Sequence, residues 1–403
     1  MPAEQGLQAP RTPDPYPSSP PPVDAGRRVR GQASVLRTMN ALRTAVTEQP
    51  RSLHATAALR IGYGFLYLAF LLREFPHRDE IWGPGSPWTP ALAGELFNQT
   101  GWSSILTLSD SRPYFEVCYL LAVVTSALFL LGWRTRVVSV VFAVVVASFH
   151  ARSIFMTDGG DNLILLMALY LCFTACGRRW SLDARRAGKR GTPKAVTALT
   201  RRSAPGLLRD LDLARRQLAT VLHNCALFVI AAQVCLLYGS AGLYKVQGSL
   251  WGNGTAIHYV LNLDLFRPWP TLSVLVDRLP MLIAVASYLT VLLQVAFPFV
   301  LFSRVKYVVL PLLIGMHVGI AVLMGLPLFS GAMVVADAVF LPDRFYGFLG
   351  RGLSRTFRRA DPVAAPTADA PSTSVPQPRP EDSHPEHRPR KPVLALEGAD
   401  EHP

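Results

Sequence analysis

Charged side chains are scarce in this sequence of 403 residues. Only 17% of the residues are charged, 50% are hydrophobic, and the mean hydropathy is +0.27. Soluble domains carry about a quarter charged residues, and here the apolar residues gather in long runs without charge. This pattern excludes an ordinary soluble domain and predicts an all-α integral membrane protein.

Two further absences exclude other classes of protein. No Cys-x-x-Cys pair is present, and each of the five cysteines lies in an apolar stretch: Cys118, Cys172, Cys176, Cys225 and Cys235. A disulfide framework and a zinc site are therefore not expected. The N-terminal residues lack an apolar h-region, so we expect no cleavable signal peptide.

Basic residues outnumber acidic ones, and the formal net charge is +13. Most Lys and Arg lie in the two terminal tails and in one loop between apolar runs. Aromatic residues do not interleave with the basic ones in the amphipathic part of that loop, as they do in many nucleic-acid sites. We therefore expect no nucleic-acid partner and interpret the charge as a sign of membrane topology.

The apolar residues form eight segments, at 53–72, 114–132, 137–155, 162–177, 221–244, 281–303, 307–325 and 327–341. A helix that crosses a membrane needs about 20 residues, so the fourth and eighth segments are short. We expect about eight transmembrane helices, of which these two are tilted or partly irregular.

The distribution of Lys and Arg predicts the orientation. Residues 178–216 carry twelve Lys or Arg and three Asp or Glu. With eight crossings, the other basic loops and the basic N-terminal tail lie on the same side as this segment. The positive-inside rule then places both termini in the cytoplasm of a multi-pass protein of the cell membrane, with the lipid bilayer as its first partner.

Three regions are expected along the chain. Residues 1–50 are rich in Pro and predict a disordered tail, with a short helix near residue 40 that lies on the membrane or is loose. Residues 51–345 form the membrane domain, including a basic cytoplasmic loop at 178–220 whose leucine spacing predicts an interfacial helix. Residues 346–403 predict a second disordered tail.

The first candidate site lies between the third and fourth segments, on the outer side. Residues 157–162 read Thr-Asp-Gly-Gly-Asp-Asn, and His150 and Arg152 precede them. In one interpretation Asp161 and Asn162 are N-caps of the fourth segment, and Arg152 extends to the lipid headgroups. In the other, the two glycines allow the backbone to approach a ligand closely.

Lys245 is the second candidate. It ends the fifth segment, which has no charged residue, on the side where the positive-inside rule requires no lysine. Partial removal from water would favour its neutral amine, which a general base needs; extension into the outer headgroups is the alternative. Glycines around Trp251 suggest a structured re-entrant turn. His258 follows the last of these glycines, Gly254, by about one helical turn.

Other polar residues within the segments have structural explanations. Gln294 and His317 are expected to form hydrogen bonds between helices. Arg60 and Asp337 both lie toward the cytoplasmic side, where they would pair with each other or extend to the interface.

These residues together resemble the HTTM family, the horizontally transferred transmembrane domain related to the vitamin K-dependent gamma-carboxylase. The resemblance covers about residues 50–345 and depends on the order and spacing of short motifs. The motifs are Arg60-Ile-Gly, Gly-Asp-Asn at 160–162, Arg179-Trp-Ser-Leu-Asp183, Ala-Gly-Leu-Tyr-Lys245 followed by Trp251 and Gly254, the patch from Gln294 to Pro298, and His317.

The resemblance implies a chemistry. In the carboxylase, a lysine in the equivalent patch deprotonates vitamin K hydroquinone, and oxygenation then yields the strong base that forms a glutamate carbanion, which captures carbon dioxide. Carried over, Lys245 would be the base, and Asp161 and Asn162 would orient a quinone. The candidate catalytic residues are Lys245, Asp161, Asn162 and His258, and the candidate cofactor contacts are Gly160, Trp251 and His150.

Two departures keep a second function open. The carboxylase has an Asn/His pair where this chain has Asp161 and Asn162, and an ionised Asp161 cannot donate to an oxyanion. The carboxylase also carries a large extramembrane domain that binds its peptide, and nothing here replaces it. The chain is therefore either a membrane enzyme for a quinone-like or exported-peptide substrate at the outer face, or a non-enzymatic transport or immunity-type partner whose polar residues hold helices together.

Overall fold

The computed structural model describes residue 44 and residues 46–189, 206–348, 350 and 351. Within these ranges the regular structure is helical and no strand is present, so the predicted all-α class is confirmed. The short helix predicted near residue 40 and the tail at 352–403 lie outside the described residues.

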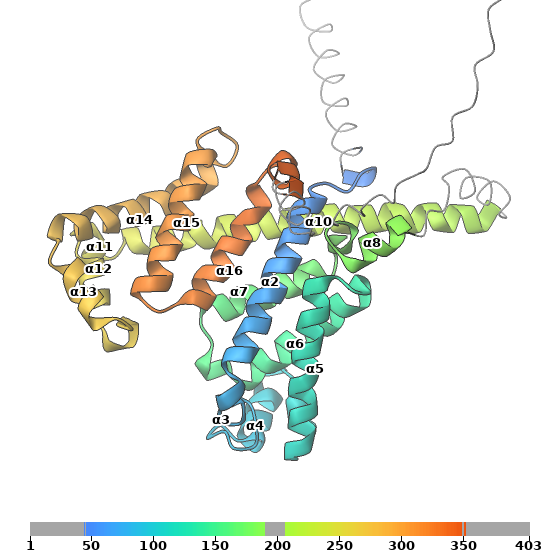
Figure 1. Ribbon diagram of the computed structural model, residues 1–403, viewed down its shortest axis with the longest axis horizontal. Coiled ribbons are helices and arrows are strands. Elements are labelled where there is room, and N and C mark those ends of the chain that lie inside the picture. Colours follow the sequence, from blue (N-terminus) through green and yellow to red (C-terminus); the bar gives the residue numbers. More distant parts are fainter. Residues whose placement is uncertain (1–43, 45, 190–205, 349, 352–403) are drawn as a thin grey trace, which may run out of the picture. The chain divides into compact units, whose positions relative to one another are not determined.

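Eight apolar helices occupy the positions of the eight predicted segments (Figure 1). Six are long and apolar enough to cross a membrane: α2 (Leu53–Arg73), α5 (Arg112–Leu131), α6 (Thr135–Arg152), α10 (Gly206–Val246), α14 (Pro280–Val300) and α15 (Lys306–Leu323). The other two, α7 (Gly159–Leu171) and α16 (Pro327–Asp337), have 13 and 11 residues. The described chain is thus a helical protein with six candidate membrane spans.

Glycine and proline set several of the helix ends. Gly132 ends α5 with a φ of 70°, a left-handed conformation that glycine adopts without a steric penalty. Gly325 has a φ of 66° and separates α15 from α16, which has a proline in its first turn. These local signals explain why the long apolar run from residue 307 forms two helices.

Helix α10 differs from its prediction. The amphipathic stretch at 207–218 does not form a separate interfacial helix, because it continues directly into the fifth apolar segment as one helix of 41 residues. No glycine or proline interrupts the chain between Gly206 and Gly239, so the backbone has no local reason to bend. Figure 1 shows α10 passing behind several of the shorter helices.

Short helices cover two of the connections. α3 (Arg78–Ile81) and α4 (Pro90–Thr100) lie between α2 and α5, and α11 (Ser249–Gly252), α12 (Ala256–Leu261) and α13 (Pro270–Asp277) lie between α10 and α14. A further helix, α8 (Leu182–Lys189), follows α7. The predicted structured turn after Lys245 is therefore a series of three short helices.

The helices pack in pairs at points of close backbone approach. α2 packs along α5, α10 packs along α14, and α16 contacts α15, α7 and α2. A Cβ atom on Gly64 would lie 2.9 Å from the backbone nitrogen of Leu130, and one on Gly242 would lie 2.8 Å from that of Val295. Both helix pairs thus depend on the absence of a side chain at one glycine.

The N-terminus of α2 meets the C-terminal end of α5, and we call this part of the molecule the α8 end. Arg60 is fully buried there and donates to the carbonyl oxygens of Phe129 (2.6 Å), Trp180 (2.7 Å) and Leu130. The rings of His54, Trp180 and Tyr346 also contact one another at this end. The start of α2, the residues before α8 and those after α16 therefore lie together.

Two expectations for basic residues are wrong. Arg60 does not pair with Asp337, because its guanidinium is taken by backbone carbonyls at the end of α5. Arg152 does not extend to the surface: it is 0% exposed and donates to the carbonyl oxygen of Gly83 over 3.2 Å. Arg60 is thus held by carbonyls at the end of α5 and before α8, and Arg152 by one carbonyl of the segment after α3.

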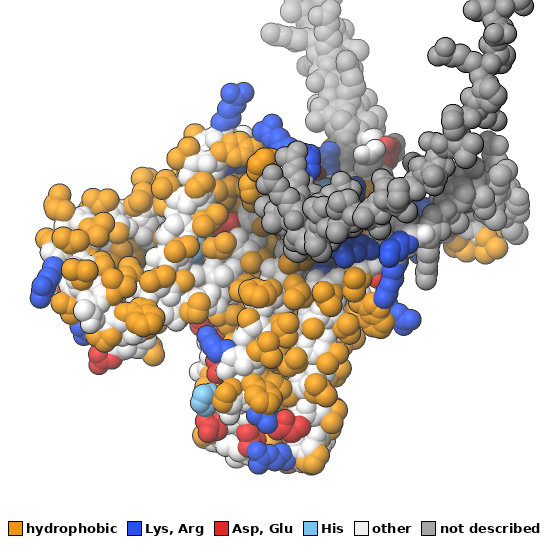
Figure 2. All heavy atoms as spheres, viewed as in Figure 1, with side chains coloured by type: hydrophobic (Ala, Val, Ile, Leu, Met, Phe, Trp, Pro, Cys, Tyr) orange, Lys and Arg blue, Asp and Glu red, His pale blue; other side chains and the backbone are white. Residues whose placement is uncertain are grey.

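The surface of the helices is largely apolar. Exposed large side chains include Phe65, Leu120, Val140, Phe228 and Phe299. Figure 2 shows apolar side chains over most of this face, whereas acidic and basic ones gather near α3 and α4 at the bottom of the view. In water such a surface is costly, so the apolar helices fit a lipid bilayer.

Candidate functional site

Asp158 is the N-cap of α7. Its side chain accepts from the backbone N–H groups of Gly160 (2.6 Å) and Asp161 (3.1 Å), and the Asp161 carboxylate accepts from the N–H of Asp158 over 2.9 Å. This reciprocal pair is a capping box. The interpretation that Asp161 helps to cap the helix is therefore correct. The N-cap itself is Asp158, however, and Asp161 is the third residue of the helix. The Asn162 amide donates to the carbonyl oxygen of Asp158.

Asp161 and His150 line the same cavity, of about 180 Å³, which we call the Asp161 cavity. Its walls come from α2, α6, α7 and the segment around α3, and most of them are aromatic or aliphatic. The lining residues are Tyr67, Phe70, Arg73, Glu74, Ile81, Trp82, Val146, Phe149, His150, Ser153, Met156, Thr157, Asp161 and Ile164. The structure thus unites two of the predicted site residues.

Three of the residues that line the Asp161 cavity each carry a buried polar atom that has no hydrogen-bond partner among the described residues. They are Tyr67 Oη, Trp82 Nε1 and His150 Nδ1, on residues that are 4%, 3% and 7% exposed. Buried polar atoms are nearly always paired, so these three atoms are exceptions in surroundings that are mostly aromatic or aliphatic. The sequence did not indicate Tyr67 or Trp82, because aromatic residues in apolar or interfacial segments are common.

Lys245 lies at the end of α10, away from the lining of the Asp161 cavity. Its Nζ donates to the carbonyl oxygen of Ala241 over 3.4 Å and lies 5.3 Å from the centre of the Trp251 ring. Among the described residues no carboxylate forms an ion pair with it. The structure therefore places Lys245 with Trp251, and no hydrogen bond or ion pair links it to Asp161.

His258 belongs to a separate, exposed group on α12 and α13. Its Nδ1 lies 2.6 Å from Oδ1 of Asp277, and Asn262 donates to Oδ2 of Asp277 over 3.1 Å. Burial alone would raise the pKa of Asp277, but these hydrogen bonds outweigh it and lower the pKa. The pair joins the two short helices, and neither residue lines the Asp161 cavity.

Three helices share a buried hydrogen-bonded cluster, Tyr238–His317–Asp337. The hydroxyl of Tyr238, on α10, lies 3.0 Å from Nε2 of His317, on α15, and donates over 3.0 Å to Oδ2 of Asp337, on α16. Because the Tyr238 hydroxyl donates its proton to the Asp337 carboxylate, its oxygen can only accept a hydrogen bond from His317. We therefore assign a proton to Nε2 of His317. The predicted interhelical role of His317 is confirmed, and its partner Tyr238 was not foreseen.

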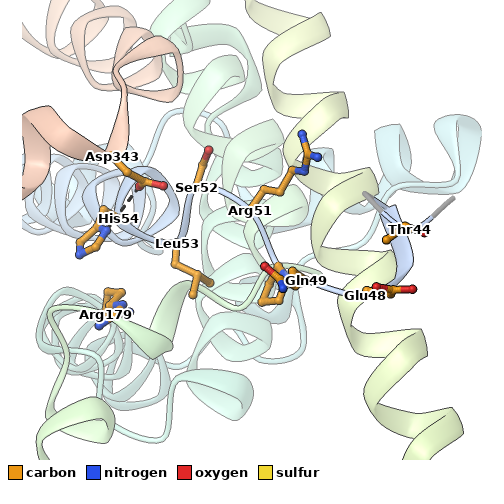
Figure 3. A pocket seen from close by; sticks show the side chains of 10 residues that line it. Thr44, Glu48, Gln49, Arg51, Ser52, Leu53, His54, Arg179 and Asp343 are labelled. Atoms are coloured by element: carbon orange, nitrogen blue, oxygen red, sulfur yellow. Dashed lines mark ion pairs between the residues drawn. The ribbon is translucent and has the colours of Figure 1, made fainter. Parts of the chain in front are cut away.

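A second cavity, of about 910 Å³, lies at the α8 end. It is lined by Thr44, Glu48, Gln49, Pro50, Arg51, Ser52, Leu53, His54, Arg179 and Asp343. Figure 3 shows the carboxylate of Asp343 turned toward His54, and their side chains approach to 3.4 Å. None of the predicted site residues lines this cavity. No group of three or more metal-binding side chains occurs within the described ranges.

Comparisons with known proteins identify no relative. No family model, no curated protein and no solved structure matches the chain.

Proposed function

We propose that this chain is a membrane enzyme of the HTTM type, with eight crossings and both termini in the cytoplasm. Eight apolar helices in sequence support the number of crossings, with α7 and α16 as short, tilted or partly irregular ones. The meeting of the α2 start, the α8 region and the residues after α16 at one end supports placing both termini on the same side. The basic residues of 178–216 make that side the cytoplasm.

The observation that carries the enzymatic proposal is the position of Lys245. Its amine has a single backbone hydrogen bond and no acidic partner among the described residues. Its neighbours along the chain are apolar and exposed: Leu243, Tyr244, Val246 and Leu250. In the proposed orientation this patch faces the outer part of the bilayer, so a lipid-soluble substrate reaches Lys245 from the membrane.

In this proposal Lys245 is the base of the reaction. A neutral amine at this place accepts the proton of an acidic hydroxyl group, as on a quinol, and Trp251 holds the resulting ammonium over its ring. A quinone such as vitamin K would supply the redox chemistry that follows. Lys245 does not line the Asp161 cavity, so in this proposal Asp161 and Asn162 do not act on the atom that Lys245 deprotonates.

Lys245→Met tests the proposal, with Lys306→Met as the matched control. Lys306 also lies at a helix end, 5.5 Å from the centre of a tyrosine ring, but on the opposite side of the proposed membrane. We expect Lys245→Met to lose conversion of vitamin K hydroquinone, followed by liquid chromatography, at an unchanged protein yield. Lys306→Met is expected to retain it. Conversion by Lys245→Met at the wild-type rate would remove Lys245 from the mechanism.

A second function is favoured by the Tyr238–His317–Asp337 cluster. Here polar groups from three helices form hydrogen bonds between the helices, as expected for a non-enzymatic membrane component, such as a transport or immunity-type partner. This function predicts that the wild-type protein converts no quinol, and that Lys245→Met changes only folding or the binding of a partner such as an exported peptide.

A further inference from the structure

The Tyr238–His317–Asp337 cluster brings three ionisable side chains together in the interior of the helices. The three residues are 1%, 1% and 2% exposed, and they come from α10, α15 and α16. A phenol, an imidazole and a carboxylate can each gain or lose a proton, and ionisable residues within membrane helices often belong to proton pathways. Such chemistry needs no quinone and stands apart from the proposed reaction at Lys245.

Asp337 has few partners for a buried carboxylate. Its Oδ2 accepts one hydrogen bond, from Tyr238, and its Oδ1 is buried without a hydrogen-bond partner among the described residues. No Lys or Arg in the described part of the chain forms an ion pair with it. A buried negative charge without a cation is costly, whereas a protonated carboxyl group carries no charge. Asp337 is therefore the member of the cluster on which an added proton would be held.

The two hydrogen bonds of the cluster form a continuous path for a proton. With its proton on Nε2, His317 donates to the Tyr238 oxygen, and the Tyr238 hydroxyl donates to Oδ2 of Asp337, each over 3.0 Å. Nδ1 of His317 then has a lone pair and no hydrogen-bond partner among the described residues. A proton added at Nδ1 lets the Nε2 proton pass to Tyr238 and the hydroxyl proton pass to Asp337. The cluster has then gained one proton, and both hydrogen bonds are kept with their directions reversed.

We propose that the Tyr238–His317–Asp337 cluster is a proton-binding site between α10, α15 and α16. It takes up one proton, which enters at His317 and is held on Asp337. The transfer within the cluster requires no movement of the helices, because the same heavy atoms serve both proton arrangements. Nδ1 of His317 and Oδ1 of Asp337 are closed to solvent, so the cluster exchanges its proton with water when the helices part briefly.

Two further ionisable groups act on the cluster. The charge of Asp337 acts on Tyr63, on α2, and the charge of Lys245, on α10, acts on His317. Tyr63 donates its hydroxyl proton to the carbonyl oxygen of Ala332 over 2.9 Å, so it does not belong to the path. A proton that passes from His317 to Asp337 moves from the residue on which Lys245 acts to the carboxylate. The direction of transfer thus agrees with the surrounding charges.

Infrared difference spectra of the full-length protein in nanodiscs, recorded between alkaline and acidic buffer, test the site without an added ligand. A carboxyl group that gains a proton acquires a C=O stretching band, and we expect the wild type to show this band for Asp337. Asp337→Asn is expected to lose it completely. The asparagine oxygen can still accept from Tyr238, so the hydrogen bond between helices is kept while the acid is removed. The melting temperature checks that the variant is folded.

Tyr238→Phe and its matched control Tyr63→Phe separate the proton path from packing. Each removes one buried tyrosine hydroxyl, but the hydroxyl of Tyr63 donates to a backbone carbonyl instead of to Asp337. We expect Tyr238→Phe to shift the Asp337 band, because the protonated carboxyl group loses its hydrogen-bond partner, and Tyr63→Phe to leave the band in place. A folded wild type without a band that Asp337→Asn removes, or a band that Tyr238→Phe leaves unchanged, would overturn the proposal.

Discussion

The helices before residue 189 and those after residue 206 bury their apolar surfaces to different extents. In α2, α5 and α6, 50%, 39% and 67% of the apolar 18-residue stretch of the helix is buried. In α10, α14 and α15, the buried share of the corresponding stretch is 28%, 28% and 22%. The first group packs mainly on itself, with Tyr63, Phe129 and Phe142 fully buried. The second group leaves most of its apolar surface for lipid to cover.

The two groups also satisfy their buried polar groups differently. In the first group Arg60 donates to backbone carbonyls at the end of α5 and before α8, and Arg152 donates to a carbonyl of the segment after α3. In the second group Tyr238, His317 and Asp337 bond to one another from three different helices. The first arrangement ties helices to the residues at neighbouring helix ends and connections, and the second joins three helices within the apolar core. The first group should therefore be the more sensitive to substitution.

Substitution of Arg60, in the first group, is expected to lower the free energy of unfolding more than any other change proposed here. Arg60→Met removes the guanidinium donor that the carbonyls of Phe129, Leu130 and Trp180 share, and each buried group left unsatisfied costs about 1–3 kcal/mol. We expect a loss of about 3 kcal/mol or more in the free energy of unfolding, visible as a large fall in melting temperature in detergent. Arg136→Met, at an exposed position on α6, should melt within a degree or two of wild type. Equal melting of the two variants would show that Arg60 is not an anchor.

The two close helix contacts allow a direct comparison of the groups. Gly64→Val brings a side chain against the backbone of Leu130, and Gly242→Val brings one against that of Val295. Overpacking of this kind costs about 1–3 kcal/mol, and we expect Gly64→Val to be the worse of the two, because its surroundings cannot move into lipid. Thermal melting measures both. Gly315→Ala is the control, because a Cβ there meets nothing within 4 Å. A larger loss in Gly242→Val would reverse the comparison.

Asp183 should give a smaller, pH-dependent effect at the α8 end. It accepts from the backbone N–H groups of Arg134 (2.9 Å) and Thr135 (2.7 Å). Burial alone would raise the pKa of Asp183, but these bonds and the one from the Thr135 hydroxyl outweigh it and lower the pKa below 3.8. Its stabilisation is therefore present above about pH 4 and is lost as the pH falls through the lowered pKa.

Asp183→Asn tests this pH dependence. We expect the variant to lose about 1 kcal/mol at neutral pH, as for a lost helix cap. The difference in melting temperature from wild type should shrink as the pH falls below about 4. A difference that stays constant down to pH 3 would mean that the charge of Asp183 is not what stabilises this end.

The sequence predicted the helices well because apolar runs, glycines and prolines are local signals. It predicted the short α7 and α16, and the break at Gly325, from these signals alone. It did not predict that α10 is continuous, since an amphipathic stretch and an apolar stretch look like two helices when each is read separately.

The candidate site was harder to predict because it depends on contacts between distant segments. His150 and Asp161 stood out as polar residues in apolar surroundings, and they line one cavity. Tyr67 and Trp82 gave no signal, because their polar atoms are hidden in ordinary aromatic residues. Lys245 is an unusual residue in the sequence, but its absence from the lining of the Asp161 cavity depends on how whole helices pack, which no local pattern encodes.

Cysteine labelling in intact cells tests the proposed eight crossings most directly. In a background without the five native cysteines, Glu95→Cys and Gly252→Cys should react with an impermeant maleimide from outside. Gly188→Cys and Arg351→Cys should react only after the membrane is opened, because α7 and α16 have crossed it. Labelling of Gly188→Cys or Arg351→Cys in intact cells would mean that one of these short helices does not cross, and would contradict the account.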